Sequence, residues 1–72
     1  MRAYTVGYKM HMADGERRIS LLAKDKQDAY DRAFYEAIPK QEGTVPYSAW
    51  LESVTYQNGN YRTFNNFEGN PY

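Results

Sequence analysis

The stretch that decides the fold runs from Ala3 to Lys24 and reads AYTVGYKMHMADGERRISLLAK. Its first half carries an apolar side chain at every second position: Tyr4, Val6, Tyr8, Met10 and Met12. A period of two places such residues on one face of a β-strand. The dipeptide Asp14-Gly15 follows, and it is favoured in type I′ turns, where both central residues need a positive φ. The stretch therefore predicts a β-hairpin over residues 3–24.

A two-residue loop at Asp14-Gly15 would set the register of this hairpin. It pairs apolar residues on one face of the two strands: Met10 with Ile19, Tyr8 with Leu21 and Val6 with Ala23. On the opposite face, it places Leu22 across from Gly7. Alternation and turn chemistry favour the same register, and a slip of one residue would reverse both faces.

A helix is predicted from Lys26 to Ile38. Asp25 is a suitable N-cap, and Asp28 adds negative charge to the first turn, where the helix dipole favours it. Apolar residues recur at three- and four-residue spacing and form one stripe: Ala29, Tyr30, Ala33, Phe34, Ala37 and Ile38. Pro39 lacks a backbone N–H and clashes with the preceding turn, so the pattern predicts that the helix ends before it.

A second hairpin is predicted over residues 47–65, because Asn58-Gly59 separates two stretches of strand-forming residues. A two-residue loop there pairs Tyr56 with Tyr61, Val54 with Thr63 and Ser53 with Phe64. The tail, residues 66–72, is either a loop held down by Phe67 and Tyr72 or a frayed end.

The two faces of the second hairpin are less distinct than those of the first. One face carries Trp50, Val54, Tyr56 and Tyr61, and the other carries Ala49, Leu51 and Phe64. We expect the first set to face the helix, because its aromatic rings offer the largest apolar area for burial. Glu52 lies on that same face, and its burial is avoided if it sits at the sheet margin or if a bulge turns it outward.

These elements assemble into a single domain, residues 1–72, with the order ββαββ. The helix returns the chain so that the third strand lies antiparallel beside the first. The prediction is an α+β fold, with a four-stranded antiparallel sheet in the order 2-1-3-4 and one helix on one face. The other face of the sheet stays uncovered.

Composition excludes several classes of protein. There is no cysteine, which removes disulfides, thiol catalysis and cysteine metal sites. The longest apolar run is three residues, which excludes a transmembrane helix or secretory signal core, and we expect a cytoplasmic protein without membrane contact. Nine basic and nine acidic residues cancel, so net charge indicates neither nucleic acid nor membrane as a partner.

The residues also predict a protein that is not an enzyme and that holds no metal or cofactor. His11 is the only imidazole, and no serine, aspartate or glutamate stands at a spacing typical of a triad. Asp25, Asp28 and Asp31 are interpreted as capping and solvating the first helical turn. The glycines stand singly and form no phosphate-binding loop.

Two kinds of binding surface remain. Apolar side chains predicted outside the core point to a protein partner or a second copy of the chain, and these are Leu22, Leu51, Phe64 and Tyr47. The alternative is a nucleic-acid-binding face made of Lys9, His11, Arg18 and Lys24 on the first hairpin, joined by Arg62. The position of Trp50 separates the two hypotheses, because an exposed row of Trp50, Tyr56 and Tyr61 beside a basic strand would favour nucleic acid.

Overall fold

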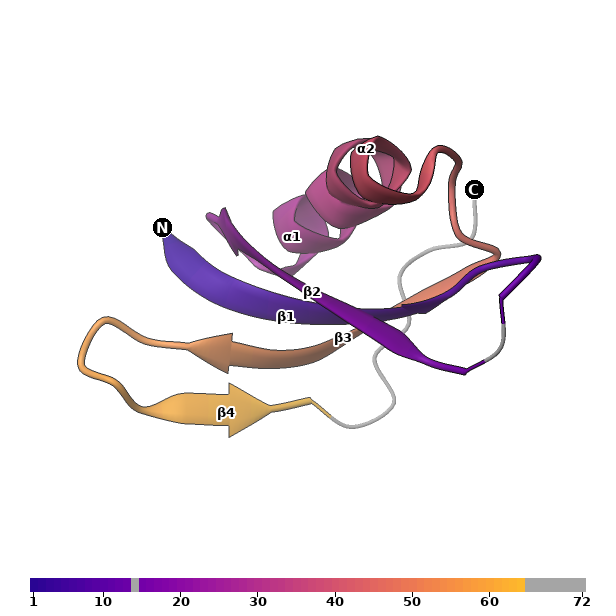
Figure 1. The fold of residues 1–72 in the computed structure, drawn as a ribbon. Coiled ribbons are helices and arrows are strands. Elements are labelled where there is room, and N and C mark those ends of the chain that lie inside the picture. The colour runs from indigo at the N-terminus through magenta and orange to yellow at the C-terminus, as the bar shows by residue number, and fades with distance from the viewer. Residues whose placement is uncertain (14, 65–72) are drawn as a thin grey trace.

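The computed structural model describes residues 1–13 and 15–64, and in it one helix crosses one face of a four-stranded antiparallel sheet (Figure 1). The strands are β1 (Arg2–Lys9), β2 (Arg17–Ala23), β3 (Ser48–Thr55) and β4 (Tyr61–Thr63), in the spatial order β2-β1-β3-β4. The helix is continuous and consists of α1 (Lys26–Arg32), the π-helical segment η1 (Ala33–Ala37) and α2 (Ile38–Glu42). The predicted α+β class, strand order and single covering helix are confirmed.

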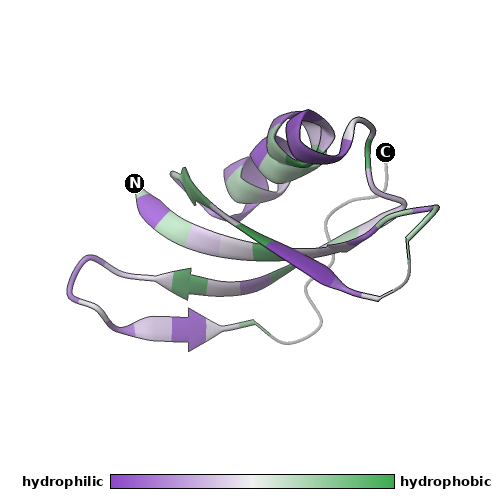
Figure 2. Ribbon diagram, in the orientation of Figure 1, coloured by the Kyte–Doolittle hydropathy of each residue, from purple (hydrophilic) through white to green (hydrophobic). Residues whose placement is uncertain are grey.

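The core lies between the sheet and the helix. Alternation along β1 directs Tyr4, Val6 and Tyr8 toward the helix, and all three are buried. The other buried apolar residues come from β2, the helix, β3 and the chain after β1: Met10, Ala23, Ala29, Tyr30, Ala33, Ile38, Ala49, Leu51 and Val54. Figure 2 shows hydrophobic and hydrophilic residues interleaved along the strands, as a sheet with one covered face requires.

The predicted register of the first hairpin is wrong by four positions. The observed pairs are Tyr8 with Arg17, Val6 with Ile19, Tyr4 with Leu21 and Ala3 with Leu22. Because four is an even shift, each paired side chain stays on its predicted face. β1 ends early, at Lys9, whose carbonyl accepts a hydrogen bond from the Tyr47 N–H at 3.1 Å.

The connection between β1 and β2 therefore spans residues 10–16 instead of a two-residue turn. Met12, predicted on the inward face, is 97% exposed, while Met10 remains buried beyond the end of the strand. Gly15 has a φ of 83°, as the turn prediction requires, and Asp14 lies outside the described residues.

The N-cap at Asp25 is confirmed, but Pro39 does not end the helix. Ile38, immediately before the proline, donates its N–H to the Ala33 carbonyl five residues back. This π turn widens the helix and accommodates the proline ring, which then lies in the first turn of α2, where its missing N–H is not needed. The helix ends instead at Glu42, before Gly43, whose φ of 91° is left-handed.

The predicted register of the second hairpin is wrong by one position. Ser53 pairs with Thr63, Val54 with Arg62 and Thr55 with Tyr61. The cause is a three-residue loop, in which Tyr56 donates its N–H to the Asn60 carbonyl at 2.7 Å and accepts from the Gly59 N–H at 3.0 Å. Gly59, with a φ of 89°, supplies the left-handed residue that such a loop needs at its last position. Residues 65–72, including the predicted tail, lie outside the described part of the chain.

A bulge in β3 decides which side chains of that strand face the helix. Thr5 pairs with Ser53, but the next residue, Val6, pairs with Leu51, so Glu52 is the extra residue. Leu51 on one side of the bulge and Val54 on the other are both buried under the helix.

The expected inward set is therefore half right. Val54 is buried and Tyr56 packs against the core, as predicted. Trp50 pairs with Gly7 on the uncovered side of the sheet, and Tyr61 is 69% exposed, so both of these assignments are wrong. The bulge turns Glu52 outward, beside Trp50.

A polar cluster ties the end of the helix to the sheet. Tyr8 donates its hydroxyl hydrogen to Glu42 Oε2 over 2.7 Å, and Gln41 Nε2 donates to the same hydroxyl oxygen over 2.9 Å. Arg17 donates to both Glu42 oxygens, over 2.7 and 2.9 Å. The hydrogen bonds from Tyr8 and Arg17 lower the pKa of Glu42, whereas burial raises the pKa of Tyr8. The cluster thus joins β1, β2 and α2 at one point.

We expect Glu42→Gln to reduce stability in a pH-dependent manner. Because the pKa of Glu42 is lower in the folded chain than its ordinary value of 4.5, its contribution is complete at neutral pH and is lost as the pH falls from 4.5 through the folded pKa. The Tm of Glu42→Gln should lie below that of the wild type at pH 7, and the difference should shrink progressively as the pH falls below 4.5. Thermal unfolding followed by circular dichroism measures this, and a constant difference down to pH 2.5 would contradict it.

Candidate functional site

The sheet face opposite the helix, here called the open face because no helix or strand within residues 1–13 and 15–64 covers it, carries three rows of side chains that each cross at least three strands, and a shorter pair, Lys9 and Ser48, at one end. Residues paired directly across strands share a face, so the register defines each row. The first row is Arg18, Gly7 and Trp50, the second is Ser20, Thr5, Ser53 and Thr63, and the third is Leu22, Ala3, Thr55 and Tyr61. Most of these residues are small, so the open face is shallow apart from the indole.

Trp50 lies over Gly7 of the inner strand β1, in a row that is toward the β1–β2 connection and that β4 does not reach. A Cβ atom at Gly7 would fall inside van der Waals contact of the indole Cε2 and Nε1 atoms, so the ring rests where a side chain would otherwise stand. Gly7 has no positive φ, and its role is therefore to provide space and not an unusual backbone conformation.

Polar contacts hold the indole in place. Trp50 donates its Nε1–H to Glu52 Oε1 over 3.2 Å, and Arg18 Nε donates to Glu52 Oε2 over 2.7 Å. The hydrogen bond and the negative charge of Glu52 raise the pKa of Arg18. These three side chains come from β2 and β3 and bridge across β1, so they form one ordered unit.

The second row is made entirely of hydroxyl side chains and crosses all four strands. Thr5 Oγ1 and Ser20 Oγ in this row lie 3.3 Å apart. Leu22 and Tyr61 are the two end members of the third row, and their side chains are 60% and 69% exposed. The open face therefore combines the Trp50 indole in one row, hydroxyl side chains in the next row, and two exposed apolar side chains at the ends of the third.

The predicted partner-binding residues do not form one patch. Leu22 and Tyr47 are exposed as expected, but they lie near opposite ends of β1. Leu51 is 1% exposed and belongs to the core, so its assignment as a surface residue is wrong. Phe64 is also misassigned, because it packs against the core with Lys26 Nζ 4.6 Å from its ring centroid.

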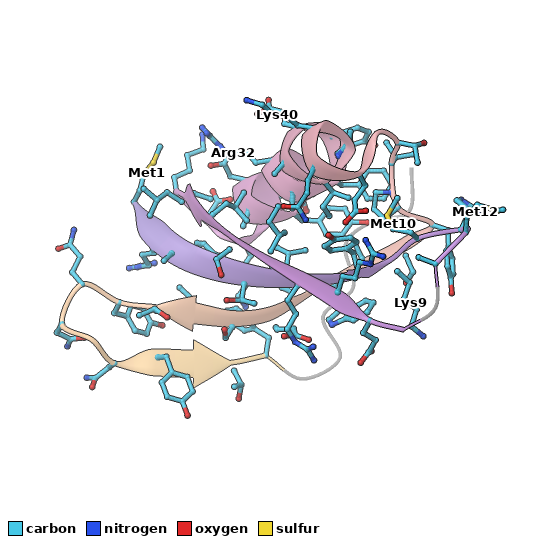
Figure 3. All side chains as sticks on the ribbon, in the orientation of Figure 1. Met1, Lys9, Met10, Met12, Arg32 and Lys40 are labelled. Carbon is cyan, nitrogen blue, oxygen red and sulfur yellow. The ribbon has the colours of Figure 1, made fainter. Side chains whose placement is uncertain are left out.

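The predicted nucleic-acid-binding residues are dispersed as well. Lys9 and Lys24 lie at opposite ends of β1, a separation of about 23 Å at 3.3 Å per residue, and Figure 3 shows Lys9 at the far end of the strand from Met1. Arg18 is ion-paired with Glu52. Arg62 pairs with Val54, which places it on the helix side of the sheet, so its assignment to the outer face is wrong.

His11 lies beside Tyr47, with the two ring centroids 5.2 Å apart, in the chain that follows β1. It therefore lies beyond the end of the open face. Its ring contact is an aromatic one with the tyrosine.

A cavity of about 570 Å³ opens at the other end of the sheet. It is lined by Met1, Arg2, Lys24, Tyr56, Gln57 and Asn58. The Arg2 guanidinium lies 5.2 Å from the centroid of the Tyr56 ring. Its lining contains cations, amides and the Tyr56 phenol, and neither a carboxylate nor an imidazole.

Within residues 1–13 and 15–64, no three histidine, cysteine, aspartate or glutamate side chains lie close enough to hold a metal ion. Asp25 and Asp28 are occupied in the helix start: Asp25 accepts from the Asp28 N–H, and the Asp28 carboxylate accepts from the Lys24 N–H and from Arg32. No helix in the described part of the chain is long and apolar enough to cross a membrane.

The Trp50–Glu52–Arg18 unit over Gly7 was not predicted. One signal for it was present in the sequence, because a glycine inside an otherwise strong strand pattern marks a close approach of other atoms to the backbone. No protein-family description, curated protein or solved structure matches the chain.

Proposed function

We propose that the chain is a small, non-catalytic accessory protein that binds another protein through the open face. The observation that carries this proposal is Trp50, which lies on Gly7 on the open face and is held there by Glu52. Tryptophan and arginine dominate the energetics of protein interfaces when they are ordered before binding. Here both residue types are ordered by the same carboxylate.

The chemistry of the open face also specifies the partner. The Arg18 and Glu52 charges neutralise each other, so the partner needs no strong charge of either sign at the centre of the contact. The hydroxyl row offers donors and acceptors, and Trp50 offers an apolar surface. A complementary protein surface presents an apolar side chain to Trp50 and hydrogen-bonding groups to the row.

Nucleic acid is the second candidate, and one observation favours it. Trp50 and Tyr61 lie on the open face, as a base-stacking surface requires. Against it, the cations that would track a phosphate backbone are dispersed or paired, and Tyr56 packs against the core instead of extending the aromatic row. We therefore favour the protein partner.

Site-specific photo-cross-linking in cells that produce the protein tests this proposal. Thr63 and Arg62 are neighbours on β4, both exposed, and lie on opposite sides of the sheet. A photoreactive residue at position 63 should cross-link to a discrete protein, and the same residue at position 62 should not. Trp50→Ala should reduce the cross-link from position 63 by about thirtyfold, which corresponds to an interface hot spot of about 2 kcal/mol.

Equal cross-linking from both positions, insensitivity to Trp50→Ala, or the absence of any cross-linked protein would each overturn the proposal. Cross-linking from position 63 to RNA or DNA alone would overturn it in favour of the second candidate.

A further inference from the structure

Strand β2 is an edge of the sheet without the usual protection against pairing. Edge strands are normally short, or carry proline, bulges or free charges. β4, at the opposite edge, has three residues and includes Arg62. β2 has seven residues, and its stretch Ile19–Ala23 contains neither proline nor charge. Figure 2 shows this hydrophobic stretch following the hydrophilic start of β2.

The two arginines of β2 do not protect its edge with free charge. Arg17 is paired with Glu42 at 2.7 Å, and Arg18 is paired with Glu52 at 2.7 Å. Glu42 and Glu52 belong to the same chain as the arginines, so the net charge along the β2 edge is already close to zero in the monomer. A second copy would therefore meet an unpaired backbone ladder with little charge repulsion.

Self-pairing of β2 has a preferred register. With Ser20 on a two-fold axis, all seven residues pair, and apolar residues meet on the helix side, where Ile19 lies opposite Leu21 of the second copy. Moving the axis to Leu21 would place Arg18 opposite Lys24, and moving it to Arg18 would place that arginine opposite itself. The central register avoids both like-charge pairs.

The helix presents a matching row of alternating charge beside this edge. Asp28, Arg32, Glu36 and Lys40 recur every four residues. The last three line a groove of about 230 Å³ together with Leu21 and Leu22 of β2, and Figure 3 shows Arg32 and Lys40 projecting from the outside of the helix. A two-fold axis at the β2 edge sets the two helices antiparallel, with Arg32 opposite Glu36 and Asp28 opposite Lys40. Every pair in that arrangement is attractive.

We infer that the chain forms a symmetric dimer in which β2 pairs with β2 of a second copy and the two helix rows lie side by side. This inference goes beyond the proposed function and does not depend on it. The two sheets join into one of eight strands, and the two open faces become continuous. One open face covers about 19 by 23 Å at usual strand spacings, which is small for a stable protein interface, and the dimer doubles it.

The expected affinity is modest. Seven paired residues span about 23 Å, and the contact area lies at the lower end of the range for stable complexes. We therefore expect dissociation constants in the micromolar range, so that monomer and dimer are both observable. Sedimentation equilibrium of the full chain between about 5 and 500 µM measures this directly.

Charge reversal on the helix tests the arrangement. Glu36→Lys places a cation opposite Arg32 of the second copy at two symmetric positions, and it should weaken dimerisation about tenfold. Arg32→Glu should weaken it similarly, and the double variant, which exchanges the two charges, should restore most of the affinity. Because Arg32 and Glu36 also stand four apart on one helix, the exchange restores their intrachain pair as well. Urea denaturation of each variant below the dissociation constant measures that effect separately, and the rescue of dimerisation must exceed it.

Amide hydrogen exchange tests the strand pairing. Raising the protein concentration across the dissociation constant should increase protection of alternate amides in β2, and amides of β4 at the other edge serve as the matched control. A chain that stays monomeric at 500 µM overturns this inference and leaves the cross-linking test at Thr63 intact, because Thr63 lies on the opposite edge strand. A dimer with added protection in β4, or without rescue by the double variant, also overturns it.

Discussion

Leu51→Asp should unfold the protein, whereas the same change at Leu22 should leave the monomer folded. Leu51 is 1% exposed and lies between β3 and the helix, so the substitution places an unpaired carboxylate in the core and removes a large apolar side chain. A loss of at least about 4 kcal/mol is expected, close to the whole stability of a small domain. Leu22 is 60% exposed, so its effect should stay within about 0.5 kcal/mol.

Urea denaturation at low protein concentration, followed by circular dichroism, measures both effects without interference from association. The comparison is sharp because the two variants carry the identical substitution. If Leu51→Asp remains as stable as Leu22→Asp, then Leu51 is not beneath the helix and the β3 bulge is misplaced.

Gly7→Ala should destabilise the protein by about 1–3 kcal/mol through overpacking. The added methyl group would occupy the position of the indole atoms of Trp50, so the ring must move away and its hydrogen bond to Glu52 breaks. Alanine is intrinsically more favourable than glycine inside a strand, so without the indole the substitution would stabilise the protein. The expected loss of stability therefore has the opposite sign to this intrinsic preference.

A double-mutant cycle with Trp50→Ala isolates this contact. Gly7→Ala should cost much less in the Trp50→Ala background, because the clashing ring is absent there, and the coupling should be about 1 kcal/mol or more. Thr55→Ala, an exposed change on the same strand, serves as a control that should show no coupling with Gly7→Ala. An equal cost of Gly7→Ala in both backgrounds would show that the indole does not lie on Gly7.

The architecture could be predicted from the sequence because each element has a strong local pattern. Period-two alternation in β1 set its inward face, and the apolar stripe after Asp25 set the face of the helix. Even the wrong register of the first hairpin preserved both faces, because a register shift of four residues, an even number, keeps the alternation in phase. Strand order followed from the length of the helix and the need for antiparallel neighbours.

The open face could be predicted only in part: a bulge that turns Glu52 outward was one of the two expected alternatives, but the side chains on this face depend on three features together. A bulge at Glu52 changes the phase of β3, and a three-residue loop at Gly59 moves β4 by one position. Trp50 faces outward because Gly7 on the neighbouring strand leaves room for its ring, a relation between residues 43 positions apart. The large apolar area of the Trp50 side chain favoured its burial beneath the helix, and an assignment based on that area alone placed it on the wrong face of the sheet.

Pro39 illustrates the same limit inside the helix. A proline disfavours the preceding α-helical turn, and that local rule predicted an end at Ile38. The π turn at Ala33–Ala37 makes room for the ring of Pro39, so the helix continues through the proline. The four added residues bring Glu42 to Tyr8 and Arg17, so the longer helix is stabilised by contacts that the local sequence does not show.

Collisional quenching of the tryptophan fluorescence tests the position of Trp50 on the open face most directly, because Trp50 is the only tryptophan in the chain. Acrylamide is added to the dilute, folded protein and the quenching constant is compared with that of the chain in urea. We expect substantial quenching in the folded state, lower than in urea, because one side of the indole rests on Gly7 and the other faces solvent. Emission that is blue-shifted and fully protected from acrylamide would place Trp50 beneath the helix and contradict the account.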